Sequence, residues 1–303
     1  MKKFFLTCLI MGLLFGSIVA HAEDLRPDYL IMVNRAANCI TVYQQDVNRE
    51  FTIPVIAFVC STGKNNKTLT GSFKTSSQYK WRKMDGGVYT QYATRFDGSR
   101  LFHSVPYYHQ KPNQLEWGHY NRLGEQASAG CVRLSCIDAK WIYDHCKPGT
   151  QVVVYDDAEN PGPLGKPTSM QIASDNPHRG WDPTDPNPAN PWITVLPHLQ
   201  LTTNTLGDNV LYLPAGSNLE TLQSAIGLFS ADGTPYLPGT YQLEVYGYYD
   251  LNQVGSYELY VRGFDLAAGL RADRSFTLIV NPISENAEIM LSSIEPMANT
   301  VDG

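Results

Sequence analysis

The sequence is poor in charge, and its acidic residues outnumber its basic ones. Charged residues make up 17% of the chain, with 29 Asp and Glu against 23 Lys and Arg, which gives a net charge of −6. This balance argues against binding to nucleic acid or to an anionic membrane surface. The chain also lacks Cys-x-x-Cys and His-x-x-x-His spacings, so its sequence indicates no metal site and no cofactor.

The apolar run at the N-terminus is too short and too interrupted to be a convincing membrane span. Lys2 and Lys3 precede a mostly apolar stretch over 4–20 that Gly12, Gly16 and Ser17 break, and a small-x-small site follows at 20–22. This pattern is typical of a cleaved signal peptide, which we place at 1–22. We therefore expect an exported protein with no membrane contact beyond that segment.

Five cysteines remain after this cleavage, and an odd number in an exported protein leaves at least one thiol unpaired. Cys131 lies in the run Ser-Ala-Gly-Cys-Val-Arg-Leu at 128–134, where strand alternation places Cys131 and Arg133 on one face. Gly130 allows the backbone to approach a substrate closely. Cys136 begins a predicted helix, where the helix dipole favours a thiolate. Local physics alone leaves both cysteines as candidate nucleophiles.

The remaining pattern predicts two β-rich domains, with a fold that is mainly β (α+β). Alternating stretches over 29–33, 39–43 and 55–60 indicate strands, and Ser135 with Asp138 marks the start of a short helix after Cys131. Residues 158–191 contain eight of the nineteen prolines and read as a semi-rigid, extended linker. Further alternation over 192–281 is typical of a β-sandwich, and 282–303 reads as a tail.

Four motifs in order resemble the L,D-transpeptidase (YkuD) catalytic domain family. The 128–134 run resembles its active-site signature, and Leu101-Phe102-His103-Ser104 resembles the strand that carries its catalytic histidine. Thr70–Phe73 and Gly149–Val154 resemble two further family segments. The resemblance covers 28–157. The pattern over 254–265 likewise resembles bacterial immunoglobulin-like wall domains, which implies an immunoglobulin-like sandwich over 192–281.

The resemblance implies a cell-wall enzyme that joins peptidoglycan stem peptides through a thioester on Cys131 and forms 3→3 cross-links. His103 would accept the thiol proton and be oriented by the carbonyl of Ser104. The amides of Gly130 and Cys131 would receive the oxyanion, with Ser128 shaping the loop. Arg133 would either bind a substrate carboxylate or brace the loop.

The chain departs from the family pattern at one position, since Ala129 stands where the family has histidine. The interval from His103 to Cys131 is also longer than is usual for the family. A wide loop over 107–120 would explain the extra length, and it would act as a lid or specificity wall. That loop carries two rival bases, His109 and His119. Alternative functions are an L,D-carboxypeptidase on the same substrate, a non-catalytic wall-binding protein and a structural adhesin. The spacing of Arg133 argues against a sortase.

Overall fold

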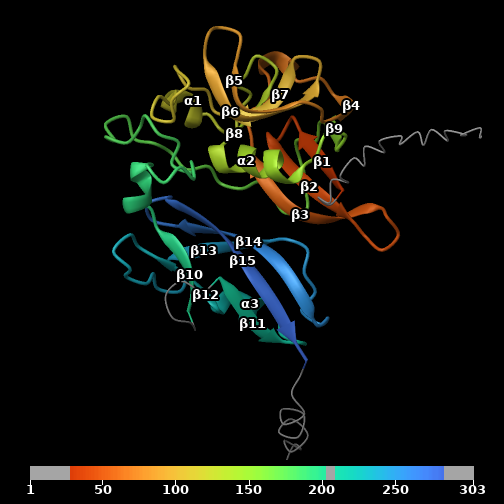
Figure 1. Cartoon of the computed structure of the whole chain (residues 1–303), viewed down its shortest axis with the longest axis vertical. Helices are drawn as coiled ribbons and strands as arrows, with labels where there is room; N and C mark the ends of the chain where they lie inside the picture. The colour runs from red at the N-terminus through yellow and green to blue at the C-terminus, as the bar shows by residue number, and fades with distance from the viewer. Residues whose placement is uncertain (1–27, 203–208, 283–303) are drawn as a thin grey trace, which may run out of the picture.

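A computed structural model describes residues 28–202 and 209–282, which form a mainly β protein of several sheets and few helices (Figure 1). The predicted signal peptide at 1–22 lies outside the described residues, as does the predicted tail from 283 onward. None of the helices in the described part of the chain is long and apolar enough to cross a membrane.

The first domain begins with a five-stranded sheet in the order β3-β2-β1-β9-β4. Its strands are β1 (Tyr29–Asn34), β2 (Cys39–Gln45), β3 (Phe51–Val59), β4 (Gly71–Lys74) and β9 (Gln151–Tyr155). The three strands predicted over 29–60 are therefore present. Alternate residues of β1 and β9, such as Ile31, Val33 and Val152, are fully buried, and each such side chain contributes about 1.5–3 kcal/mol.

A second sheet of the first domain, in the order β5-β6-β7-β8, carries the motifs around His103 and Cys131. Its strands are β5 (Gln78–Lys83), β6 (Tyr89–Asp97), β7 (Arg100–Ser104) and β8 (Val132–Leu134). The helix α2 (Cys136–His145) packs against β6, β7 and β8. Phe102, Val132 and Leu134 fill this contact and are fully buried. The sheet therefore has one face closed by α2, and its other face is left for the functional residues.

The start of α2 matches the prediction in part. The Ser135 side chain accepts a hydrogen bond from the Asp138 amide at 3.4 Å, as an N-cap should. The reciprocal half of a capping box is absent, because the Asp138 carboxylate instead pairs with Arg262 and Arg271 of the second domain.

The segment predicted as a linker at 158–191 has almost no helix or strand, but it is packed against the first domain and does not act as a free spacer. Met170 and Ile172 join Trp192 in a buried cluster with Tyr107, Tyr120 and their neighbours. Asp182 accepts a hydrogen bond from the Cys136 amide at 2.9 Å, at the N-terminus of α2. These apolar anchors and this helix cap explain why a proline-rich segment adopts one fixed path here.

The second domain is a β-sandwich with its own core. A four-stranded sheet has the order β11-β15-β14-β13, and a two-stranded sheet pairs β10 with β12. Its elements are β10 (His198–Leu201), β11 (Val210–Pro214), α3 (Leu219–Ser224), β12 (Ile226–Phe229), β13 (Tyr241–Tyr246), β14 (Gly255–Asp265) and β15 (Arg271–Asn281). Three short helices precede this domain in the chain, namely η1 (Lys64–Asn66), α1 (Trp117–Tyr120) and η2 (Pro191–Thr194). The predicted sandwich is present, and its immunoglobulin-like kinship stays a prediction.

The two domains are docked through a buried network of charges. Asp138 of α2 accepts hydrogen bonds from Arg262 of β14 at 2.9 Å and from Arg271 of β15 at 2.7 Å. Asp273 binds both arginines from the other side. Asp138 and Arg262 are fully buried, and Arg271 and Asp273 nearly so. Figure 1 shows α2 and β3 above the strands β13–β15 that carry this network.

Candidate active site

His103 lies near the end of β7 in a form suited to accept a proton. Its Nδ1 lies 2.6 Å from the carbonyl oxygen of Ser104. A carbonyl only accepts, so Nδ1 carries the proton and Nε2 keeps its lone pair. Burial lowers the pKa of His103 to about 4, with Arg133 acting in the same direction and the Ser104 hydrogen bond opposing it. The imidazole is therefore neutral at pH 7.

Cys131 immediately precedes β8, the strand beside β7. The parallel register pairs His103 with Arg133, so alternation along β8 places Cys131 and Arg133 on the face to which His103 belongs. A cavity of about 200 Å³ on this face is lined by all three residues. The Cys131 thiol is partly exposed, whereas Cys39, Cys60, Cys136 and Cys146 are buried.

The resting site is a neutral thiol beside a neutral imidazole. Burial raises the pKa of the Cys131 thiol, and a hydrogen bond from the Leu101 backbone, Arg133 and Arg100 offset this only in part. The thiol therefore needs a base to become a nucleophile at neutral pH. His103, with a free Nε2 on the same cavity, is the group that can supply this function.

The loop before Cys131 is organised by Ser128. Its hydroxyl donates to the carbonyl of Cys131 at 2.5 Å and accepts from the Gly130 amide at 3.0 Å. Gly130 has φ of +140°, a conformation that a residue with a side chain rarely adopts. The Gly130 amide, which we expect to receive the oxyanion, donates to the Ser128 hydroxyl in this arrangement, and its oxyanion role stays a prediction. The loop-shaping role of Ser128 agrees with these contacts, and the Cys131 amide as oxyanion donor stays a prediction.

Three residues that the sequence did not single out hold this loop in place. Thr68 donates from its hydroxyl to the Gly130 carbonyl at 2.8 Å and accepts from the Gly63 amide at the same distance. A Cβ on Gly63 would lie 2.9 Å from the Cα of Gly130. Arg100 lines the cavity and donates to the Lys67 carbonyl at 2.9 Å. Isolated Thr, Gly and Arg residues carry no periodic signal, so only the fold shows that they meet.

Arg133 combines a brace for the loop with unused hydrogen-bonding capacity. Its Nη1 donates to the Ala127 carbonyl at 3.3 Å, which is the bracing role. Its Nε is buried without a partner among the described residues. Burial lowers the pKa of Arg133, while nearby Glu116 and Cys131 act in the opposite direction. A guanidinium with an unsatisfied donor beside the cavity suits a carboxylate ligand, so the substrate-binding role stays a prediction.

The rival residues are placed less well for catalysis. Neither His109, which is exposed, nor His119, whose Nε2 lies 3.4 Å from Glu116, lines the cavity. Burial raises the pKa of Cys136 well above the usual thiol value. The 107–120 loop includes the fully buried Tyr107 and Tyr120, so it forms a packed wall and not an open lid.

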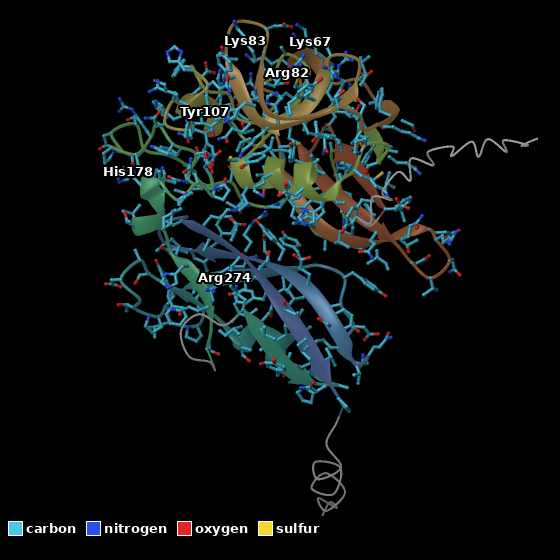
Figure 2. All side chains as sticks on the ribbon, in the orientation of Figure 1. Lys67, Arg82, Lys83, Tyr107, His178 and Arg274 are labelled. Carbon is cyan, nitrogen blue, oxygen red and sulfur yellow. The ribbon has the colours of Figure 1, made fainter. Side chains whose placement is uncertain are left out.

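The part of the chain around the cavity is strongly basic although the whole chain is acidic. Residues 64–100 contain eight Lys and Arg against two Asp and no Glu. Figure 2 shows Lys67, Arg82 and Lys83 at the end of the first domain that lies away from the second domain. The cavity lining itself holds the guanidinium groups of Arg100 and Arg133 against one carboxylate, that of Asp85, so the local field favours an anionic substrate.

A partly exposed thiol and a neutral, carbonyl-oriented imidazole on adjacent strands define the kind of site that cysteine-dependent acyl-transfer enzymes use. Residues 28–154 match the family model of the L,D-transpeptidase catalytic domain, YkuD. The match covers 127 of the 303 residues, less than half of the chain.

A curated relative is similar to a limited stretch of the chain. YciB of Bacillus subtilis (strain 168), a proposed L,D-transpeptidase, is 42% identical over 57 residues, which are 19% of this chain and 28% of YciB.

Two solved structures each align with 43% of the chain. An L,D-transpeptidase from Mycobacterium smegmatis is 19% identical over 59% of its own length, with a TM-score of 0.35. A fused Zn-dependent amidase/peptidase/peptidoglycan-binding domain-containing protein from Clostridium acetobutylicum ATCC 824 is 26% identical over 54% of its length, with a TM-score of 0.33. The chain thus spans less than two thirds of each of these proteins.

Proposed function

We propose that the protein is a cysteine-dependent L,D-transpeptidase that acts on peptidoglycan stem peptides outside the cytoplasm, in the cell wall. The observation that carries the proposal is that one cavity is lined by the partly exposed thiol of Cys131 and by His103, whose Nε2 is free to accept a proton. The family match of residues 28–154 supports the same chemistry.

The first half of the reaction forms a thioester. Nε2 of His103 takes the proton of the thiol as Sγ of Cys131 attacks the carbonyl that joins the third stem residue to the terminal D-alanine. The amide of Cys131 stabilises the oxyanion of the tetrahedral intermediate. The intermediate collapses with cleavage of the C–N bond, and the imidazolium returns its proton to the leaving amine of D-alanine.

The second half transfers the acyl group. An amine of a neighbouring stem peptide attacks the thioester carbonyl, His103 takes the proton that the amine loses, and the thiolate of Cys131 leaves and regains that proton. The product is a 3→3 cross-link. Water in place of the amine gives the L,D-carboxypeptidase reaction on the same thioester.

Substrate binding follows from charge. A stem peptide carries carboxylates, and the unpartnered Nε of Arg133 together with the basic segment 64–100 provides groups that attract them. The whole chain has a net charge of −6, so this excess of positive charge is local and does not extend over the whole protein.

The test is incubation of the purified protein with a disaccharide-tetrapeptide, with product masses read by mass spectrometry. A dimer lacking one D-alanine supports transpeptidation, and a tripeptide monomer indicates the carboxypeptidase. Cys131→Ser abolishes both products and Cys136→Ser, the matched cysteine control, leaves them almost unchanged. Unaltered substrate with the unmodified protein would favour a non-catalytic wall-binding role.

A further inference from the structure

A second, larger cavity lies between the two domains, away from the catalytic face. It has a volume of about 560 Å³ and is lined from the first domain by β1, β3 and α2 and from the second by β14 and its neighbours. Small-molecule sites typically have volumes of roughly 300–1,000 Å³ and often lie at domain interfaces. Because α2 covers the opposite face of the β5–β8 sheet from His103 and Cys131, this cavity is separate from the active site.

The cavity exists because the interface closes at one end of β14 and stays open at the other. Alternation along β14 directs Ser256, Glu258, Tyr260 and Arg262 to the same face of the sheet. Arg262 seals one end by its ion pair with Asp138, and it is fully buried. Towards the other end Ser256 and Glu258 are exposed and line the cavity. The charge network thus fixes the width of the gap.

The polar groups of the lining are available to a ligand. Across the residues that the structure describes, the side chains of Ser256, Glu258 and Ser275 make no hydrogen bond to protein, although all three line the cavity. They offer two hydroxyl groups and a carboxylate. A ligand with many hydroxyl groups can use such donors and acceptors together.

Aromatic side chains supply the apolar part of the lining from both domains. Trp141 comes from α2, where its ring stacks on His145 with centroids 4.4 Å apart. Tyr248 and Tyr260 come from the second domain, and Tyr248 is 44% exposed. Flat aromatic rings beside free hydroxyl and carboxylate groups match the two surfaces of a sugar ring, its C–H face and its hydroxyl edge.

The charges of the lining disfavour the other ligand classes. Lys140 forms an ion pair with Asp144 on α2, so its positive charge is already neutralised and does not attract an anionic ligand. Glu258 then gives the cavity a net negative charge, which opposes phosphates, nucleotides and free carboxylates. This is the reverse of the basic surroundings of Cys131, so the two cavities select different chemical groups.

We propose that this interdomain cavity binds a neutral segment of saccharide, the glycan strand to which the stem peptides are attached. The choice of polymer rests on the proposed function, whereas the preference for a sugar rests on the lining. Binding there would hold the protein on the polymer while the catalytic cavity engages a peptide.

The test is calorimetric titration of the purified Cys131→Ala protein, in which chemistry is blocked, with N-acetylglucosamine tetramer, a neutral saccharide. We expect saturable binding, weakened at least tenfold by Tyr248→Ala and by Glu258→Gln, two exposed positions. Tyr212→Ala, at a 60% exposed tyrosine of β11 outside the cavity, is the matched control and leaves binding unchanged.

Three results would overturn the proposal: no saturable binding at millimolar sugar, binding that both cavity variants leave intact, or displacement of the sugar by free stem peptides. Acylation of Cys131 by a carbapenem is measured in parallel on the unsubstituted protein. Sugar binding without acylation would refute the catalytic proposal alone, and acylation without sugar binding would refute this one alone.

Discussion

Removal of the Asp138 carboxylate should uncouple the two domains and destabilise both. The side chain is fully buried and accepts hydrogen bonds at 2.9 Å from Arg262 and at 3.2 and 2.7 Å from the two terminal nitrogens of Arg271. In Asp138→Ala, the two buried guanidinium groups keep the buried carboxylate of Asp273, and Arg262 also keeps the partly exposed Glu244 at 3.6 Å. The guanidinium nitrogens that donate to Asp138 then lose their acceptor and have no solvent to replace it.

The size of the effect follows from this geometry. Loss of one partner from a buried ion pair costs about 3–5 kcal/mol, most of it from the charge left unpaired. The matched control is Glu125→Ala, which removes an ion pair with Arg122 whose carboxylate side chain is 60% exposed. An exposed pair of this kind contributes about 0–1 kcal/mol. We therefore expect the two variants to differ by several kcal/mol.

The assay exploits the distribution of tryptophan. All five tryptophans lie at or before residue 192, so their fluorescence reports the first domain and its packed 158–191 segment, whereas far-ultraviolet circular dichroism reports both domains. In guanidinium titrations the unsubstituted protein should give coincident transitions, and Asp138→Ala should give a lower midpoint with the two signals separated. A loss below about 1 kcal/mol, no larger than for Glu125→Ala, would refute the reasoning.

Three further predictions concern the catalytic site. The acid limb of the pH profile of kcat/KM should have its midpoint at about 4, because burial lowers the pKa of His103 to that value. His103 acts only when unprotonated, so activity rises as the pH rises through the midpoint. A midpoint near 6.5, the usual pKa of histidine, would contradict this prediction. Gly63→Ala should lower kcat by about tenfold or more, because the new Cβ meets the Thr68 amide at 2.7 Å and the Gly130 Cα at 2.9 Å and displaces the Cys131 loop. Steady-state kinetics would show the loss, with Gly118→Ala, whose new Cβ meets nothing within 4 Å, as the control that keeps its activity. Full activity of Gly63→Ala would exclude this effect. kcat/KM for a carboxylate-bearing stem peptide should fall as salt is raised from 50 to about 500 mM, and Lys83→Glu should flatten that dependence; rates independent of salt would argue against steering by segment 64–100.

The strands and the order of the motifs were accessible from sequence because they rest on local periodicity. Alternation of apolar residues predicts β1 and β2, and the Ser135 cap predicts the start of α2. The choice between Cys131 and Cys136 was not accessible to local physics. Burial favours Cys131, since Cys136, the first residue of α2, is fully buried while Cys131 lines a cavity.

The contacts between distant segments could not be predicted from sequence. Asp138 is separated by 124 residues from Arg262 and by 133 residues from Arg271. In the sequence each of these residues is typical of a surface charge. Residues 158–191 have the composition of a spacer, yet a few apolar anchors such as Ile172 fix them to the first domain. The Ser128 hydroxyl that occupies the Gly130 amide also depends on loop geometry that no spacing reveals.

The most direct test of the catalytic account is intact-protein mass spectrometry after exposure to a carbapenem, followed by peptide mapping. The account predicts a single acyl adduct on Cys131, absent in Cys131→Ser and formed far more slowly in His103→Ala. An adduct on another residue, or an undiminished rate of acylation in His103→Ala, would contradict it.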